Sequence, residues 1–470
     1  MSLAEVAEVV GGVVHDAGPG SGTDVQVVGG AFVDSRTPEP GGLFVALVGA
    51  QRDGHDFAGD AVRAGAAAVL GARPTGHPTV VVPDPAAGLT RLARDVASRL
   101  DATVVALTGS QGKTGTKDLL AAVLAGAGRT VATRGNANNE IGLPLTVLRA
   151  DADTEFLVLE MGARHLGNIR ELCTVARPDV ALVLNVGTAH LGEFGSRENI
   201  ACTKGEIVEA LDPAGVAVLN ADDPLVAAMA ARTRGRVLTF GTGEGADVRL
   251  LDVHLDSAGY PGFMLAAREP SAVAAPVRLG MLGAHNAANA AAAAAAALAC
   301  GIDLPAAAAV LDGSTAASRW RMELHERGDG VIVVNDAYNA NPESMRAALE
   351  TLAVLGRGRP TARTVAVLGE MLELGDSSRD EHDAVGECAV RLGVQQLVVV
   401  GDGARPIHEA ACREQSWAGS SAFVPDTGAA LAWLREHLTP HDVVLFKSSR
   451  DSHLRQLAEQ VLADGARGGG

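Results

Sequence analysis

The sequence predicts an α/β protein built from three domains. The chain has 470 residues, which is too long for one ordinary hydrophobic core. Apolar, β-prone runs alternate with helix-like patterns over most of its length, and this alternation is typical of parallel sheets covered by helices. The pattern of apolar runs and turn residues changes twice along the chain, so we expect domains over residues 1–84, 85–315 and 316–470.

The first two regions differ in how their apolar runs are interrupted. Residues 1–84 contain short runs broken by Gly, Pro and Asp, as in "GGLFVALVGAQRDGHDF", and predict a small α/β unit with several loops. In the second region four apolar runs predict parallel strands between helices: "ATVVALTG", "TEFLVLEMG", "PDVALVLNVG" and "GVAVLNADD". The alanine run at 290–299 is interpreted as helix packing.

The third region repeats the strand–turn–helix pattern. Its predicted strands lie in "GVIVVNDAYNANP", "RTVAVLGEM", "QQLVVVGDG" and "DVVLFKSSR". Polar residues occupy the carboxyl ends of these strands, which is the edge where open parallel sheets bind ligands. They are Asp336, Glu370, Asp402 and Lys447.

Composition excludes several classes of function. A net charge of −17 argues against a general nucleic-acid or membrane-surface binder, and an aromatic content of 3% argues against base-stacking platforms. The five cysteines are scattered, without a metal-binding or disulfide spacing. No secretory signal or membrane-spanning run is visible. We therefore expect a reduced, cytoplasmic protein, and a monomer, because no heptad or repeat appears.

One short segment, "LTGSQGKTGTKDLL" at 107–120, predicts a nucleotide site. It follows an apolar strand and opens a helix, where main-chain N–H groups and the helix dipole favour an anion. The general phosphate-loop pattern would place glycine at Leu107, so the spacing here departs from it. We expect the glycines to let a triphosphate approach, Lys113 to neutralise it and Thr114 to bind Mg²⁺. The loop comprises Gly109, Ser110, Gln111, Gly112, Lys113 and Thr114.

Several polar residues follow this loop in a definite order. Asn138 and Asn139 lie in "TRGNANNEIGLPLTVL", Glu160 ends a predicted strand, His190 lies in a glycine-rich loop and Lys204 lies near a helix start. Each alone has an ordinary structural explanation. Their joint order behind a phosphate loop indicates an enzyme.

The order and the sequences of these segments resemble those of the Mur ligase family over nearly the whole chain. The resemblance rests on "TGSQGKTGTK", "GNANNEIGLPLTVL", "EMGARHLGNIREL", "GTAHLGEFGS", "TKGEI", "GAHNAANAAAA", "NDAYNANPESM" and "LGEMLELG". The asparagine-rich "NANNEIG" and "DAYNANPESM" are similar to the branch that adds D-Ala-D-Ala. The "DNPR"-type motif of the branch that adds diaminopimelate or lysine is absent from the sequence.

The resemblance implies an activity and a domain plan. The family has an N-terminal UDP-substrate domain, a central ATPase and a C-terminal Rossmann-like domain. Its reaction here would join D-Ala-D-Ala to UDP-N-acetylmuramoyl-tripeptide through an acyl phosphate, releasing ADP and phosphate, in peptidoglycan precursor synthesis. Carried over by motif, Glu160 and His190 resemble metal ligands beside Thr114, Lys204 resembles a lysine that becomes carbamylated, and two Mg²⁺ ions are implied.

The same resemblance assigns the nucleotide. Asn286 and Asn289 stand three apart at the start of an Ala-rich helix, where the family binds adenine. Asp336 resembles the ribose ligand. Arg321 resembles the arginine that reaches the γ-phosphate, with Arg319 as an alternative that stays open.

It also assigns the other two substrates. Ser35 and Arg36 fall where the family binds the UDP-sugar, together with Phe44, which could equally be a core residue. Lys447 and Arg450, in "LFKSSRDSHL", are candidates for the dipeptide carboxylate, and Ser448 there replaces the usual glycine. The remaining candidates for substrate contacts are Asn138, Asn139, Tyr338, Asn339 and Asn341, of which Asn341 is also the expected N-cap of a helix that begins with Pro342.

Two other functions stay open at this point. One is another amino-acid ligase of the same superfamily, such as a folylpolyglutamate synthase-like or cyanophycin-type enzyme. The other is a regulatory module in which ATP only toggles domain closure, and the grouping of Glu160, His190 and Lys204 argues against it. The third peptide residue of the acceptor leaves no mark in the sequence.

Overall fold

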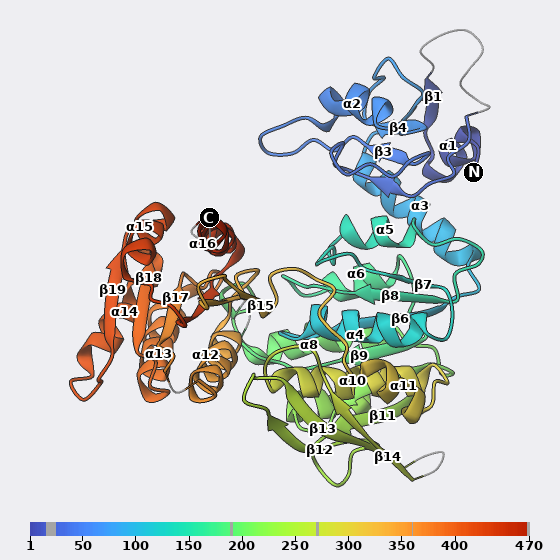
Figure 1. Cartoon of the computed structure of the whole chain (residues 1–470). Coiled ribbons are helices and arrows are strands. Elements are labelled where there is room, and N and C mark those ends of the chain that lie inside the picture. The colour runs from blue at the N-terminus through green and yellow to red at the C-terminus, as the bar shows by residue number, and fades with distance from the viewer. Residues whose placement is uncertain (16–24, 189–190, 269–271, 360, 468–470) are drawn as a thin grey trace.

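Three β-sheets follow one another along the chain. The computed structural model describes residues 1–15, 25–188, 191–268, 272–359 and 361–467. In Figure 1 the N-terminal part lies above the central part, and the C-terminal part lies beside the central part, on the left. The predicted three-part α/β organisation is confirmed. None of the described helices combines the length and apolar character that crossing a membrane requires.

The N-terminal sheet has five strands within the described residues, and β1 is the antiparallel one. In spatial order they are β1 (Val13–His15), β5 (Thr79–Val81), β4 (Ala68–Gly71), β3 (Leu43–Val45) and β2 (Ala31–Phe32). Helix α1 (Leu3–Val10) packs its apolar face on this sheet, and α2 (Ala58–Arg63) follows the short 3-10 helix η1 (Gly54–Phe57). A capping box of Ser2 and Glu5 fixes the start of α1.

Helix α3 (Pro85–Arg99) connects the N-terminal and central sheets. Asp84 caps its first turn and Pro85 occupies the first helical position. Leu89 and Leu92 join the N-terminal core, whereas Ala93 joins the central core. The expected domain boundary after residue 84 therefore precedes a helix that packs on both sides.

The central sheet has nine strands in the part of the chain that the structure describes. Neighbours are parallel from β7 to β12 and antiparallel from β12 to β14. In spatial order the strands are β14 (Val273–Arg278), β13 (Pro261–Ala267), β12 (Val248–Leu255), β11 (Arg236–Gly241), β10 (Val216–Asn220), β9 (Val180–Val183), β6 (Thr103–Thr108), β8 (Phe156–Glu160) and β7 (Thr130–Ala132).

Helices cover both faces of the parallel part of this sheet. The described helices of the central part are α4 (Lys113–Ala125), α5 (Gly142–Val147), α6 (Asn168–Cys173), α7 (Leu191–Phe194), α8 (Arg197–Glu209), α9 (Pro224–Ala227), η2 (Ala228–Arg232), α10 (His285–Ala299) and α11 (Leu304–Leu311). Residues 290–297 of α10 are alanines with no exposed surface, and α10 packs on α4 and on the sheet. The small side chains permit this close approach, so the interpretation of the alanine run as packing is confirmed.

The antiparallel extension β12–β14 differs from the alternation expected over 85–315. Strands β12 and β13 are joined without an intervening helix, and at the turn between them the Gly259 N–H donates to the Asp256 carbonyl oxygen, 2.9 Å away. Gly259 has φ +81°, which suits glycine. Tight turns suffice for antiparallel neighbours, whereas parallel neighbours need crossovers.

The C-terminal sheet has six described strands, and five of them are parallel. In spatial order they are β15 (Glu323–Glu326), β16 (Ile332–Asn335), β20 (Val443–Lys447), β17 (Thr364–Leu368), β18 (Gln396–Val400) and β19 (Ser420–Val424). The helices are α12 (Pro342–Arg357), α13 (Ser378–Arg391), α14 (Arg405–Arg413), α15 (Thr427–His437) and α16 (Leu454–Arg467), with short 3-10 turns η3 (Gly375–Ser377), η4 (Asp402–Ala404) and η5 (Arg450–Ser452). The four strands expected here are confirmed as β16, β17, β18 and β20.

Candidate functional site

The glycine loop lies between β6 and α4, as the sequence predicts. Gly112 stands at the N-cap of α4 with φ +79°, a conformation that favours glycine. A Cβ at Gly109 would lie 2.8 Å from Cβ of Leu184. Both glycines are therefore required by this backbone.

Lys113 folds back over the loop that precedes it. Its Nζ donates to the Gly109 carbonyl oxygen, 2.7 Å away. Burial lowers the pKa of Lys113, Glu160 opposes this, and Arg321 lowers the pKa further. Two cations and one carboxylate are thus close enough to influence one another at the loop.

Glu160 is the last residue of β8 and is 1% exposed. Its Oε1 accepts a hydrogen bond from Nδ2 of Asn138, 2.7 Å away, whereas its Oε2 is buried without a partner among the described residues. An unsatisfied buried carboxylate oxygen is costly unless a cation or donor meets it. Glu160 therefore fits a hard divalent cation, which prefers oxygen ligands.

Lys204 lies in α8 and is 6% exposed. Burial, and then the charge of Lys113, hold the pKa of Lys204 well below its usual range. His190, the other expected metal ligand, lies outside the described residues. Within the described ranges no group of three His, Cys, Asp or Glu side chains could hold a metal ion. A cation at this loop would therefore depend on oxygens such as those of Thr114 and Glu160.

Arg321 comes to the loop from the segment between α11 and β15. Its NH2 nitrogen donates to Thr114 Oγ1, 3.2 Å away, and its guanidinium lies 4.4 Å from the Tyr338 ring centroid. Trp320 and Met322 on either side have φ of +59° and +51°, which is rare for bulky residues and costs about 1–3 kcal/mol each.

The alternative arginine, Arg319, points elsewhere. It pairs with Glu459 at 2.8 Å, and its side chain is 65% exposed. Of the two arginines that the sequence left open, Arg321 is the one that reaches the glycine loop.

The two asparagines of α10 lie directly behind the loop. Nδ2 of Asn286 donates to the Leu282 carbonyl oxygen at 2.8 Å, and Nδ2 of Asn289 donates to Oδ1 of Asn286 at 2.9 Å. Oδ1 of Asn289 lies against Gly112. Their amide nitrogens are thus bonded within the protein, and their expected contact with adenine stays a prediction.

Asp336 and Lys447, expected at two different ligands, are paired with each other. Nζ of Lys447 lies 2.5 Å from Oδ2 of Asp336, and the Lys447 side chain is 2% exposed. Nζ of Lys447 also donates to the Asn339 carbonyl oxygen at 3.2 Å, and Oδ1 of Asp336 accepts from the Met322 N–H at 3.2 Å. In this arrangement neither charge faces an open surface for ribose or for a dipeptide carboxylate.

The loop after β16 combines structural and exposed residues. Tyr338 stacks on Trp320 with ring centroids 6.3 Å apart, and burial raises the pKa of Tyr338. Asn339 is exposed. Asn341 caps α12 through the Ser344 N–H, and Pro342 starts the helix, so the expected N-cap is confirmed.

Two expected substrate contacts in other regions have structural explanations. Phe44 is 1% exposed and packs on Phe32 with ring centroids 5.5 Å apart, which favours the core alternative, and its contact with the UDP-sugar stays a prediction. Oδ1 of Asn139 accepts from the Gly142 N–H at 2.9 Å and thereby supports the start of α5.

Of the remaining candidates, Ser35 is half-buried, whereas Arg36 and Arg450 are exposed. Ser35 follows β2, and the neighbouring Arg36 is 86% exposed and pairs with Asp34. Arg450 is exposed at the start of η5. Ser448, in place of the family's glycine, is buried and has no positive φ, so the local backbone accommodates a side chain.

Three residues that the sequence analysis did not single out touch the loop or its neighbours. Oδ1 of Asn185 accepts from the N–H groups of Ser110 and Gln111. The Thr188 N–H and Oγ1 donate to Oε1 of Glu343, at 3.1 and 2.9 Å. For Asn185 the available signal was position, since it directly follows the apolar run that ends in "VLNVG".

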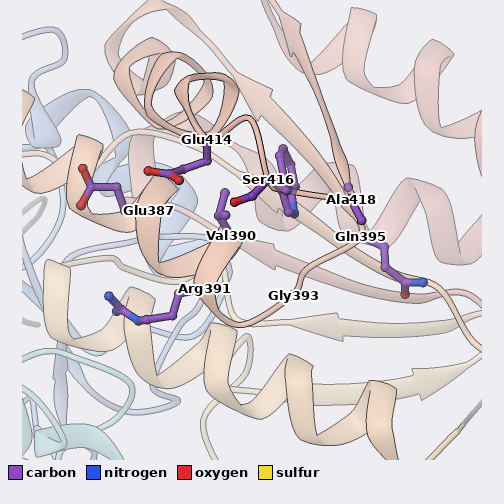
Figure 2. A pocket seen from close by; sticks show the side chains of 10 residues that line it. Glu387, Val390, Arg391, Gly393, Gln395, Glu414, Ser416 and Ala418 are labelled. Carbon is purple, nitrogen blue, oxygen red and sulfur yellow. The ribbon is translucent and has the colours of Figure 1, made fainter.

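Two hollows among the described residues lie away from the glycine loop. One of about 620 Å³ lies in the C-terminal part beside Trp417, between the end of α13 and the start of β18 (Figure 2). That is the amino edge of the parallel strands, opposite the edge that carries Asp336. Another, of about 450 Å³, lies between the N-terminal and central parts and includes Glu39, Arg134 and Arg149. Neither includes a residue of the glycine loop.

Comparison with known proteins identifies relatives along the entire chain. Three family models match: the Mur ligase family catalytic domain over residues 28–94, the Mur ligase middle domain over 107–297 and the Mur ligase glutamate ligase domain over 320–450. The chain is 47% identical to the UDP-N-acetylmuramoyl-tripeptide–D-alanyl-D-alanine ligase of Mycobacterium tuberculosis, covering 99% of this chain and 98% of the relative. It is 36% identical to the Bacillus subtilis enzyme of the same name, covering 98% of each.

Solved structures agree with these sequence relatives. A crystal structure of MurF from Acinetobacter baumannii has a TM-score of 0.83 and 32% identity, covering 98% of each chain. A MurF ligase from Thermotoga maritima, solved in complex with ADP, has a TM-score of 0.75 and 32% identity, covering 93% of this chain and 98% of that one.

Proposed function

The chain belongs to the Mur ligase family, and we propose that it uses ATP to join D-Ala-D-Ala to UDP-N-acetylmuramoyl-tripeptide, releasing ADP and phosphate. This step belongs to peptidoglycan precursor synthesis. The observation that carries the proposal is the meeting of Lys113, Glu160 and Arg321 at one glycine loop. The identity of the substrates rests on the full-length relatives named above.

The nucleotide is held by its triphosphate at the glycine loop. The start of α4 supplies main-chain N–H groups, and Lys113 exchanges its bond to the Gly109 carbonyl for the phosphate oxygens. Arg321 enters from the segment leading to the C-terminal domain and adds a second cation beside Thr114. Both cations stabilise charge that builds on the γ-phosphate during transfer.

The chemistry then proceeds in two displacements. A carboxylate oxygen of the tripeptide attacks the γ-phosphorus of ATP, and the bond from that phosphorus to the β–γ bridging oxygen breaks. ADP departs, and the tripeptide becomes an acyl phosphate. The amine nitrogen of D-Ala-D-Ala attacks the acyl carbon, loses a proton and displaces inorganic phosphate. Arg321, on the interdomain segment, already lies beside Thr114, so its charge meets the γ-phosphate when ATP binds, while closure of the C-terminal domain excludes water from the acyl phosphate.

Divalent cations are the expected companions of this reaction. The buried, unpartnered Oε2 of Glu160 and the hydroxyl of Thr114 are the described groups that would hold Mg²⁺. When bound, Mg²⁺ neutralises phosphate oxygens where the carboxylate approaches. His190 and a modified Lys204 would hold a second ion, by resemblance to the family.

Burial of Lys204 supports its carbamylation. Burial, and then the charge of Lys113, lower the pKa of Lys204, and a lowered pKa favours the neutral amine. A neutral amine adds to CO₂ and loses a proton, which leaves a carbamate anion. Removing a buried positive charge beside Lys113 favours the same product. A ¹³C carbamate signal from protein incubated with ¹³C-bicarbonate, lost in Lys204→Ala, is the expected result.

A substrate-dependence assay tests the proposal. Purified protein is given ATP, Mg²⁺ and UDP-N-acetylmuramoyl-tripeptide, with D-Ala-D-Ala, single amino acids or no amine. We expect ADP and phosphate, with a matching amide product, only when D-Ala-D-Ala is present. Formation of AMP, or equal turnover with a single amino acid, would overturn the proposed reaction.

A further inference from the structure

Asn185, in the turn after the neighbouring strand, makes hydrogen bonds to the glycine loop. It stands two residues beyond β9, which pairs in parallel with β6, so it faces the loop at the carboxyl edge of the sheet. Its Oδ1 accepts from the N–H groups of both Ser110 and Gln111, each at 3.0 Å. Its Nδ2 donates to the Gln111 carbonyl oxygen at 3.2 Å.

Hydrogen bonds that involve main-chain groups also connect this turn to the glycine loop. The Ser110 N–H also donates to the Asn185 carbonyl oxygen at 3.1 Å. The Gly187 N–H donates to Oγ of Ser110 at 2.9 Å. The segment after β9 therefore holds the first half of the glycine loop through both main chain and side chain.

These bonds decide which loop groups are available to phosphate. The N–H groups of Ser110 and Gln111 are occupied by Asn185 and do not point freely into the site. The second half of the loop, from Gly112 to Thr114, opens α4 and carries the helix N-terminus. Fixing the first half holds the second half in place before a nucleotide arrives, which reduces the entropy lost on binding.

Asparagine suits this position because one planar side chain supplies both an acceptor and a donor. Alanine would leave the Gln111 N–H without its acceptor, while Ser110 would keep its bond to the main chain at residue 185. Aspartate would keep the acceptor oxygens but lose the donor to the Gln111 carbonyl, and it would add a negative charge beside the triphosphate.

We propose that Asn185 is a positioning residue for phosphate binding, which holds the first half of the glycine loop so that the second half is preorganised for the nucleotide. The proposal rests on nucleotide binding at this loop, as in the proposed function. It assigns Asn185 no contact with a substrate.

Direct nucleotide binding tests the proposal. Binding of ADP to the full chain is measured by isothermal titration calorimetry for the wild type and Asn185→Ala. We expect ADP affinity to fall at least about tenfold, the effect of about one well-formed hydrogen bond. In ligation assays the KM for ATP rises by a similar factor, while the KM values for the tripeptide and D-Ala-D-Ala stay unchanged.

Asn220 provides a matched control. It ends β10, the strand next to β9, and its Nδ2 donates to the Leu184 carbonyl oxygen at 2.8 Å, without touching the glycine loop. Asn220→Ala removes a comparable bond one residue before Asn185. We expect its ADP affinity to stay within about twofold of the wild type.

The outcomes separate this proposal from the proposed function. Unchanged or tighter ADP binding by Asn185→Ala overturns the proposal, because the side chain then plays no part in preorganisation or blocks the loop. If Asn185→Ala does not fold, the near-isosteric Asn185→Asp takes its place, with Asn220→Asp as control, and unchanged ADP affinity overturns the proposal equally. A wild type that binds ADP but does not ligate D-Ala-D-Ala refutes the proposed function only.

Discussion

Replacing Lys447 by methionine separates a structural role from a ligand-binding one. The Lys447 side chain is 2% exposed, and its charge is paired with Asp336, whose side chain is 12% exposed. Methionine keeps much of the volume but leaves the Asp336 carboxylate buried, with the Met322 N–H as its one remaining donor among the described residues. Breaking a buried ion pair in this way costs about 3–5 kcal/mol, a large share of the about 5–15 kcal/mol that stabilises a domain.

The double variant Lys447→Met with Asp336→Asn measures how much of that cost is an unpaired charge. Removing both charges leaves a neutral amide that still accepts from the Met322 N–H. We expect the double variant to recover most of the lost stability, because isolated buried charge is the expensive species. The coupling between the two sites then appears as a strong departure from additivity.

Tryptophan fluorescence during urea unfolding is a suitable assay for this cycle. The three tryptophans of the chain, Trp320, Trp417 and Trp433, all lie in the C-terminal region, so their signal reports the part that contains the ion pair. If Lys447→Met unfolds at the wild-type urea concentration and instead raises the KM for D-Ala-D-Ala, Lys447 faces the dipeptide and the structural interpretation is wrong.

Other regions give three further predictions. Asn138→Ala removes the donor to Glu160, so the Mg²⁺ concentration for half-maximal ligation should rise about tenfold, and an unchanged Mg²⁺ titration would contradict this role. Phe44→Ala should destabilise the N-terminal part by about 3–5 kcal/mol, which limited proteolysis would detect as faster cleavage. Phe44→Leu should leave the KM for the UDP-substrate unchanged. A raised KM in a stable Phe44→Leu protein would instead indicate a binding role for Phe44. Hydrogen bonds from the His55 N–H and ring lower the pKa of Asp53, so its stabilising effect is complete above about pH 4 and fades as the pH falls toward the lowered value. Melting temperatures of the wild type and Asp53→Asn should therefore converge in acid, and a constant difference would exclude this linkage.

The glycine loop was predictable because its chemistry is contiguous in the sequence. A strand, two glycines, Lys113, Thr114 and a helix follow one another, and local geometry alone brings them together. The choice between Arg319 and Arg321 was of another kind. The two are separated by one residue, and the direction of each depends on the left-handed backbone of Trp320, which no local preference of tryptophan would suggest.

Pairings between distant segments were the least predictable part of the site. Asp336 and Lys447 each have the residue type and strand-end position of a ligand-binding group, and 111 residues separate them. Strands β16 and β20 are neighbours in the sheet, so both side chains reach the same edge and neutralise each other. Residue type therefore predicted charged side chains at this edge of the sheet. The order of the strands, which the sequence does not show, pairs these two charges with each other.

The segment after β9 shows why position in the sheet matters more than motif at this site. Asn185 and Gly187 hold Ser110 of the glycine loop, and one residue later Thr188 holds Glu343 of α12. Four consecutive residues thus link the phosphate loop to the first turn of a C-terminal helix. A strand in the middle of a parallel sheet has neighbours on both sides, so the turn at its carboxyl end can reach parts of the chain that are remote in sequence. Displacement of α12 must therefore either break the bonds of Thr188 or pull on the residues that hold the glycine loop.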